Sequence, residues 1–437
     1  MNTIVSVTGP SGVGKTTISK IISICLGHKE TLILSGDDCH LWERSDENWK
    51  FKTHLDPQSN NLNLEYEQIS ALKHGQKIDR RFYDHSTGKF TEPKTIKPKK
   101  YIVYEGLHSM YGKMSELPDI SFYIEVDKSL KNQWKIQRDT KKRGYSIEQA
   151  VKAIERRKKD ERKFIEPQRE ACDIVIKFKK NETKKIEISF DYQDPKFVPL
   201  VNKIKNLYSK LQEFIFVSKE LSLNEHLVQN KGGNLSFKHG DVIVITESGH
   251  SFSDVNYFEG FGFYDKSGKS IFSDQKRPSM EINCHLQLGP CCLHTHPLHA
   301  LAILCSEESE ETLTNLFNDI EILDYLPPGE LLAKNIKKHK DLFLKNHGIF
   351  ISGEDMVNCL KRTVDIDKTC QQFLENRIKN KKFLFPDGFV LEEENKFYHS
   401  YIKDLIKSAG LTEKFLKQKE TQFLNEMEEE KYRRTIK

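Results

Sequence analysis

The first part of the chain constrains the fold more than any other segment. Residues 3–8 are β-branched and apolar, as in a buried parallel strand. A glycine-rich loop, Gly9-Pro-Ser-Gly-Val-Gly-Lys-Thr16, follows at once, and residues 16–26 carry apolar side chains at helical spacing. In such a strand–loop–helix unit the glycines let backbone N–H groups surround phosphate oxygens, and the helix dipole favours their negative charge. The sequence therefore predicts a phosphate-binding loop that opens a parallel sheet.

The side chains of this loop predict a site for a nucleoside triphosphate with Mg²⁺. Lys15 is placed to reach the outer phosphates, and the hydroxyl of Thr16 is a ligand for Mg²⁺. We expect ATP to be the nucleotide. The predicted phosphate-binding residues are Gly9, Ser11, Gly12, Gly14, Lys15, Thr16 and Thr17.

Strand-like and helical patterns alternate through the first half of the chain, which is typical of an α/β fold with a parallel sheet and helices on both faces. The expected strands are residues 3–8, 31–35, 101–104, 121–126 and 174–176. The expected helices between them include residues 64–73, 130–141 and 147–163. In such folds ligands bind beyond the carboxyl ends of the strands.

Polar residues follow three of the expected elements. Asp37 comes after the second strand, where a carboxylate can orient or deprotonate an acceptor hydroxyl. Glu105 comes after strand 101–104, where such folds hold Mg²⁺. A basic group on residues 130–141 and the following loop can clamp phosphates. Its members are Lys135, Arg138 and Arg143.

Several separated motifs resemble phosphoribulokinase, within the wider uridine kinase superfamily. They include Asp37-Asp-Cys-His40, Tyr83-Asp-His85, Glu105-Gly-Leu-His108, Arg143-Gly-Tyr-Ser146 and Ile165-Glu-Pro-Gln168. The resemblance implies a P-loop kinase domain over residues 1–195, with Asp37 as catalytic base and Glu105 and Thr16 holding Mg²⁺. It also implies that the sugar phosphate or the transferring phosphate contacts His40, Arg44, Lys135, Arg138 and Arg143.

Two points limit this resemblance. Val13 stands where the photosynthetic enzymes carry a regulatory cysteine, so thiol switching of that type is not expected. The segment after Phe178 is also shorter, which leaves three acceptors open: ribulose 5-phosphate, another ketose phosphate, or a nucleoside.

Three histidines in the second half form a candidate metal site. His294 and His296 lie on an expected strand, where alternation places both on one face. His347 lies in a second strand-like run, residues 342–351. Three neutral imidazoles leave an open coordination position, which is the pattern of a catalytic rather than a structural metal.

The motifs around these histidines resemble the class II aldolase/adducin family, in an α/β/α domain over residues 200–437. They include Gly233-Asn-Leu-Ser236, Ile245-Thr-Glu-Ser-Gly249, Arg277-Pro-Ser-Met-Glu281, Tyr325-Leu-Pro-Pro-Gly329 and Asn346-His-Gly348. The resemblance implies Zn²⁺ on His294, His296 and His347, with Glu281 as a further ligand or as the acid/base. The implied phosphate pocket is Gly233, Asn234, Ser248, Gly249 and Ser279.

Several features of this half stay open. Met280 stands where some aldolases have a second serine, so the site either binds phosphate more weakly or takes a different substrate. Different members of the family use this metal site for aldol cleavage, epimerisation, dehydration or decarboxylation. Adducin-like relatives are instead binding modules. A tyrosine from a neighbouring subunit often completes the site, and Tyr398 and Tyr401 are candidates. We interpret His285 and His299 as structural or solvent-facing.

Composition bears on partners and compartment. The chain has 437 residues and a net charge of +5, because its many Lys residues are nearly balanced by Glu and Asp. It has no apolar run long enough to span a bilayer. We therefore expect a cytoplasmic protein that binds neither nucleic acid nor membrane. Its nine cysteines should be reduced thiols. The expected partners are small-molecule sugar phosphates and further copies of the chain, in a tetramer through the aldolase-like domain.

Overall fold

The computed structural model describes residues 1–437 except 182–185, 274–275, 337–340, 378–393 and 415–437. The described chain divides into two compact units, Met1–Tyr208 and Ser209–Lys437. The division falls inside helix α5 (Val198–Ser222). The domain limits 1–195 and 200–437 stay a prediction.

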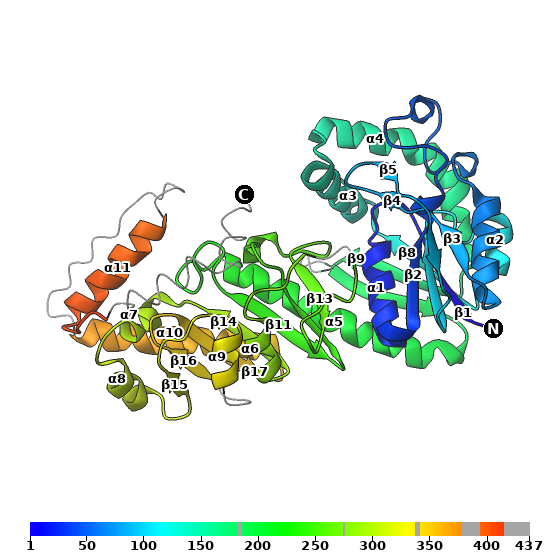
Figure 1. The fold of residues 1–437 in the computed structure, drawn as a ribbon. Helices are drawn as coiled ribbons and strands as arrows, with labels where there is room; N and C mark the ends of the chain where they lie inside the picture. The colour runs from blue at the N-terminus through cyan, green and yellow to red at the C-terminus, as the bar shows by residue number, and fades with distance from the viewer. Residues whose placement is uncertain (182–185, 274–275, 337–340, 378–393, 415–437) are drawn as a thin grey trace. The chain divides into compact units, whose positions relative to one another are not determined.

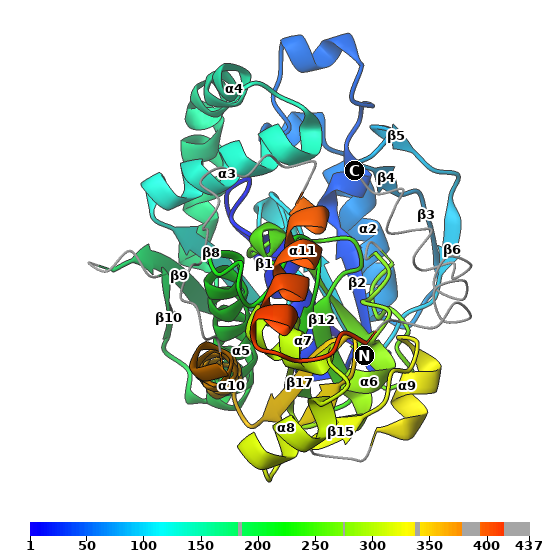
Figure 2. The same ribbon diagram turned by 90° about the vertical axis from the view of Figure 1, so that its left-hand side faces the viewer.

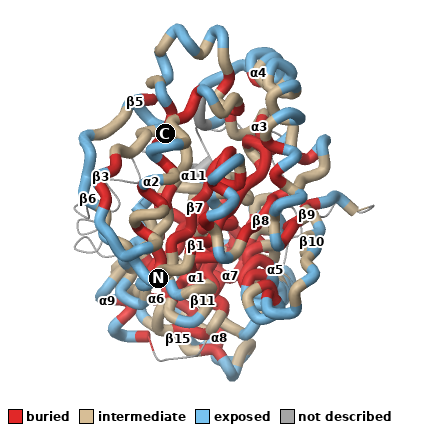
Figure 3. Tube along the Cα trace, turned by 90° about the vertical axis from the view of Figure 1, so that its right-hand side faces the viewer, coloured by how far each residue is buried: buried red, intermediate tan, exposed pale blue. Residues whose placement is uncertain are grey.

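A six-stranded sheet forms the centre of the first unit, in the order β10-β9-β8-β1-β7-β2. Five strands run parallel, and β10 pairs antiparallel with β9 at one edge. Figure 3 shows the buried backbone along β1, β7 and β8. The strands are β1 (Thr3–Thr8), β2 (Thr31–Ser35), β7 (Tyr101–Glu105), β8 (Ile120–Val126), β9 (Ile174–Lys180) and β10 (Ile186–Tyr192).

Four helices accompany this sheet: α1 (Lys15–Leu26), α2 (Leu62–Lys73), α3 (Lys128–Arg143) and α4 (Ile147–Asp160). Helix α1 packs on β2 and β7, and α3 packs on α4. The side chain of Ser146 caps α4 in a capping box with Gln149. Two short hairpin-like pairs, β3 (Ile78–Arg80) with β6 (Lys94–Ile96) and β4 (Tyr83–Asp84) with β5 (Lys89–Phe90), lie outside the main sheet.

A seven-stranded sheet forms the second unit, in the order β13-β12-β11-β14-β17-β16-β15. All its pairs are antiparallel except β15 with β16. The strands are β11 (Asn234–His239), β12 (Val242–Thr246), β13 (Phe261–Asp265), β14 (Cys291–Thr295), β15 (Glu321–Leu323), β16 (Leu342–Leu344) and β17 (Gly348–Gly353).

Helix α10 (Met356–Arg377) packs on β14 and β17, and α7 (Leu298–Leu304) packs on both α10 and α11 (Glu394–Ser408). Figure 2 shows α11 from the front and α10 end-on. The remaining helices are α6 (Ile282–Gln287), α8 (Ser309–Leu316) and α9 (Glu330–Asn335). None of the helices in the described ranges combines the length and the apolar character needed to cross a bilayer. The nine cysteines are free thiols.

The expected fold class is confirmed, with two local differences. Residues 342–351 are not one strand: β16 and β17 form an antiparallel pair, because Asn346 takes a φ of 57° and reverses the chain. The lysine-rich segment after residue 177 is not only a join. Its side chains alternate in burial along β10, which extends the first sheet.

Candidate active sites

The phosphate-binding loop lies between β1 and α1 and is held close to strand β8. A Cβ atom at Gly9, whose φ is +141°, would lie 2.6 Å from the carbonyl oxygen of Ile124, so only glycine fits there. Lys15 Nζ donates to the carbonyl oxygens of Gly9 and Pro10 at 3.0 Å each. All seven residues predicted to bind phosphate belong to this loop or to the first turn of α1.

Thr16 and Glu105 meet at the carboxyl end of the sheet. Strand β7 pairs with β1 and ends at Glu105, and Thr16 Oγ1 donates to Glu105 Oε1 at 3.0 Å. Burial raises the pKa of Glu105, while the charge of Lys15 lowers it. A hydroxyl and a carboxylate oxygen this close to the loop are ligand types that suit Mg²⁺.

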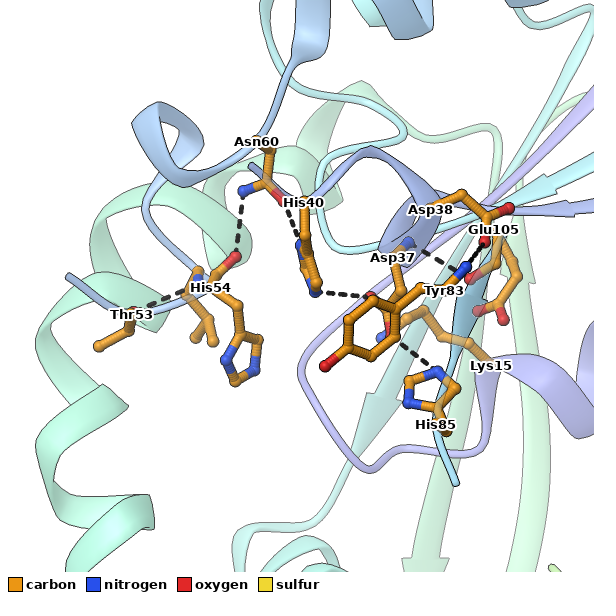
Figure 4. A network of polar contacts seen from close by, with 12 residues as sticks. Lys15, Asp37, Asp38, His40, Thr53, His54, Asn60, Tyr83, His85 and Glu105 are labelled. Carbon is orange, nitrogen blue, oxygen red and sulfur yellow. Dashed lines mark hydrogen bonds and ion pairs between the residues drawn. The ribbon is translucent and has the colours of Figure 1, made fainter. Parts of the chain in front are cut away.

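Asp37 follows β2 and is flanked by two imidazoles (Figure 4). Its Oδ2 lies 3.3 Å from His85 Nε2, and its Oδ1 lies 3.5 Å from His40 Nε2. Burial alone would raise the pKa of Asp37, but the hydrogen bond from His85 and the charges of His40 and His85 outweigh it and hold the pKa well below its usual range. Asp37 is therefore a carboxylate at neutral pH.

The structure adds residues to this group that the sequence reasoning did not assign. Asn60 Oδ1 lies 2.7 Å from His40 Nδ1 and orients that ring. The ring centroid of His54 lies 6.1 Å from that of His40, and burial together with the charge of Arg157 holds the pKa of His54 well below its usual value. His54, Asn60 and His85 all stand in stretches that resemble the family, so the sequence could have pointed to each of them.

The predicted basic residues are not equivalent. Lys135 is 4% exposed and lies against the loop, since a Cβ at Gly12 would come within 3.3 Å of its Cβ. Burial, with the charges of Arg157 and Arg138, lowers the pKa of Lys135 to about 6. Arg44 is exposed and donates to the carbonyl oxygen of His85.

Arg138 is paired with its neighbour Asp139, donating to Oδ1 at 3.0 and 2.8 Å. Arg143 ends α3, and its side chain lies outside the described residues.

The three histidines of the second unit converge, as expected. His294 lies on β14, His296 follows that strand directly, and His347 lies in the turn between β16 and β17. One nitrogen of each lies within 4.8 Å of the others. A Cβ at Gly348 would lie 2.5 Å from the Thr295 oxygen and 2.6 Å from His296 Cδ2, so the turn needs glycine.

The donor atoms fit a transition metal. His294 Nδ1 lies 2.9 Å from the carbonyl oxygen of Ile349, which can only accept, so Nδ1 carries the hydrogen and Nε2 of the neutral ring is a bare lone pair. That Nε2 lies 3.0 Å from His296 Nε2 and 3.4 Å from Glu281 Oε2. Glu281 Oε1 lies 3.3 Å from His347 Nε2. Such a cluster of nitrogen and carboxylate donors suits Zn²⁺.

A cavity of about 230 Å³ opens over these groups. Glu281 is 4% exposed, and although burial would raise its pKa, His294, His347 and Asn234 hold it well below its usual value. Lys231, His250 and Tyr325 also line the cavity, and the sequence reasoning did not assign them. All five residues of the predicted phosphate pocket line it as well: Gly233, Asn234, Ser248, Gly249 and Ser279.

The remaining candidates lie elsewhere. Tyr401 lines a second cavity of about 320 Å³ in its own chain, and the side chain of Tyr398 is outside the described residues. His299 is buried, with Nδ1 2.9 Å from Asp367 Oδ2. His285 is fully buried behind Glu281.

Comparison with known proteins divides the chain in the same two halves. Residues 4–185 match the family model "Phosphoribulokinase / Uridine kinase family", and residues 212–374 match "Class II Aldolase and Adducin N-terminal domain". Phosphoribulokinase from Synechocystis is 38% identical over 174 residues, which are 40% of this chain and 52% of that protein. The chain thus spans about half the length of this relative.

Two solved structures were also similar. Phosphoribulokinase from Rhodobacter spheroides is 21% identical with a TM-score of 0.39, covering 44% of this chain and 81% of that one. L-fuculose 1-phosphate aldolase from Thermus thermophilus is 18% identical with a TM-score of 0.33, covering 40% of this chain and 99% of that one.

Proposed function

Because the chain joins a phosphoribulokinase/uridine kinase family domain to a class II aldolase family domain, we propose a bifunctional enzyme of sugar phosphates. The first domain transfers the γ-phosphoryl group of ATP to a ketose phosphate such as ribulose 5-phosphate. The second cleaves a phosphorylated ketose by a retro-aldol reaction. One product pair follows: cleavage of a pentulose 1,5-bisphosphate between C3 and C4 gives dihydroxyacetone phosphate and glycolaldehyde phosphate.

The observation that carries the kinase proposal is that Asp37, an ionised carboxylate, lies at the same edge of the sheet as Lys15 and Glu105 (Figure 4). Asp37 accepts the proton of the acceptor hydroxyl as that oxygen attacks the γ-phosphorus. Lys15 leaves its two carbonyl partners to bind the outer phosphates, and ADP departs. Thr16 and Glu105 would hold Mg²⁺, which neutralises phosphate charge when bound.

The second domain supplies proton transfer and phosphate binding. His294, His296 and His347 would hold Zn²⁺, which polarises a ketose carbonyl when bound. Glu281 Oε1, the oxygen that faces His347, takes the proton of the C4 hydroxyl as the C3–C4 bond breaks and C4 becomes an aldehyde, and then delivers that proton to carbon C3. Backbone N–H groups and hydroxyls around Gly233, Ser248 and Ser279 bind the phosphate of the ketose.

The kinase half is tested by ADP release from Mg-ATP with a panel of ketose phosphates, free ketoses and nucleosides. We expect release with a ketose phosphate, and a fall in kcat of ~10²–10⁴-fold for Asp37→Asn. The matched control is Asp79→Asn, a carboxylate of β3 that bonds the exposed Thr95. Release with nucleosides alone would refute the proposed acceptor class.

The lyase half is tested separately by supplying phosphorylated ketoses with Zn²⁺ and no ATP. We expect two smaller carbonyl products, and loss of them in His294→Ala. An epimerised, dehydrated or decarboxylated product instead would assign the metal site to that reaction and refute the retro-aldol proposal.

A further inference from the structure

A row of buried polar side chains runs from Glu281 away from the cavity. Asn234 Nδ2 donates to Glu281 Oε2 at 2.7 Å. Asn234 Oδ1 is bonded to His285 Nε2, and His285 Nδ1 lies 2.7 Å from Ser236 Oγ. The exposed fractions of Asn234, His285 and Ser236 are 5%, 0% and 1%. These three residues are called the Glu281 relay below.

Secondary structure explains why these side chains meet. Asn234 and Ser236 are two residues apart on β11, so they share one face of the sheet. Glu281 and His285 are four residues apart at the start of α6, where the backbone N–H of His285 bonds the carbonyl oxygen of Glu281. One helical turn and one face of a strand therefore hold the whole row.

The hydrogen bonds of the relay can run in only one direction. Glu281 is a carboxylate and only accepts, so Asn234 must present its amide nitrogen to it and its amide oxygen to His285. His285 Nε2 then has to carry the hydrogen. In the neutral ring Nδ1 is consequently an acceptor, and the hydroxyl of Ser236 donates to it. Every donor points toward Glu281.

We propose that His285 is a positioning residue for Glu281, acting through Asn234. Its Nε2–H fixes the amide plane of Asn234, and that amide holds Glu281 Oε2 while Oε1 stays directed toward His347. The inference rests on the proposed role of Glu281 in proton transfer, but the orientation of the relay does not depend on which reaction follows.

The surroundings of the relay explain why each of its members needs a hydrogen-bond partner. His285 packs edge-on against Phe350, with ring centroids 5.6 Å apart, and its buried position is separated from solvent. An unsatisfied amide or imidazole in such a place is costly, so each member needs its partner. Hydrogen bonds to a carboxylate are stronger than neutral ones, which ties the relay to Glu281 rather than to the core alone.

Two substitutions at His285 separate positioning from packing in the full-length protein. His285→Gln keeps an N–H that can reach Asn234, whereas His285→Met has a similar size and no donor. We expect His285→Met to lower kcat for ketose cleavage by about tenfold or more with little change in KM, and His285→Gln to recover most of it. His239→Met, on the same strand as the relay but outside it, is the control.

Internal controls keep a folding defect apart from a positioning defect. The kinase activity and the thermal unfolding midpoint of each variant are measured on the same sample and should stay near wild type. Equal lyase activity of the Gln and Met variants, with both folded, would overturn the proposal.

A second readout does not use activity. Histidine-selective ¹⁵N NMR of the metal-free protein, with His285→Gln for assignment, should show His285 as the neutral tautomer protonated on Nε2. Protonation on Nδ1 instead would reverse the relay and overturn the inference. If the wild-type protein cleaves no phosphorylated ketose, the proposed function fails, and this spectrum still decides the relay.

Discussion

Among single residues, Lys135 is a buried amine beside a phosphate-binding loop. Burial and two nearby guanidinium groups lower its pKa to about 6, so above that pH the free enzyme holds it mainly neutral. An arriving phosphate favours the charged amine and raises this pKa. We therefore predict that binding of a phosphorylated ligand takes up a proton near pH 7.

Titration calorimetry in buffers of different ionisation enthalpy measures this proton uptake. Lys135→Met should abolish the buffer dependence, while Lys141→Met on the same helix should leave it intact. Identical buffer dependence in the wild type and Lys135→Met would contradict the assignment.

His85 should set the acidic limit of the kinase reaction. Its hydrogen bond lowers the pKa of Asp37, and the base works only when ionised, above that pKa. Removing this contribution in His85→Ala raises the pKa of Asp37, so kcat/KM should begin to fall at a higher pH than in wild type. The pH profile measures the shift, with His74→Ala, directly after α2, as control. A superimposable acid limb would argue against Asp37 as the base.

Strand β17 has a glycine at each end, and only one of them touches the metal site. Gly348→Ala would push a Cβ to 2.6 Å from His296 Cδ2, whereas at Gly353 the nearest atom, Cys359 Sγ, would lie 3.4 Å away. We predict that Gly348→Ala weakens Zn²⁺ binding by at least about tenfold, and that Gly353→Ala leaves it near wild type. Competition with a chromophoric chelator measures both affinities, and equal affinities would contradict this account.

At the level of elements, the sequence predicted best the short apolar strands that end at a glycine. β1 and β2 have the expected bounds, and Gly9 and Gly36 follow them directly. The hairpin of β16 and β17 was missed, although Lys345-Asn-His-Gly348 interrupts the apolar run with residues that favour a turn, and Asn346 takes the positive φ that reverses the chain.

The residues of the candidate sites could be predicted only in part from the sequence. Residues in spaced motifs, such as Lys15 and His294, were found because loop chemistry and strand alternation place them. His285 was interpreted only as structural or solvent-facing, because its role comes from a contact with Asn234, which lies far from it in the chain. Such pairings are visible only in three dimensions.

On the scale of the whole molecule, the two candidate active sites lie in different compact units of the described chain. Residues of the two sites share no element, so a substitution in one should leave the other working. We predict that Asp37→Asn loses phosphoryl transfer and keeps ketose cleavage, and that His294→Ala does the reverse. Assaying both reactions on each purified variant measures this, and loss of both activities in a variant that remains folded would show that the sites depend on each other.

The central claim is that one chain phosphorylates a ketose phosphate and cleaves a phosphorylated ketose. Phosphorus NMR of the purified protein with Mg-ATP, Zn²⁺ and ribulose 5-phosphate tests it directly. The account predicts ADP, a transient bisphosphate, and then two smaller phosphate esters, with the bisphosphate accumulating in His294→Ala. A spectrum in which ATP and ribulose 5-phosphate stay unchanged, or in which the bisphosphate is stable with the wild-type protein, would contradict it.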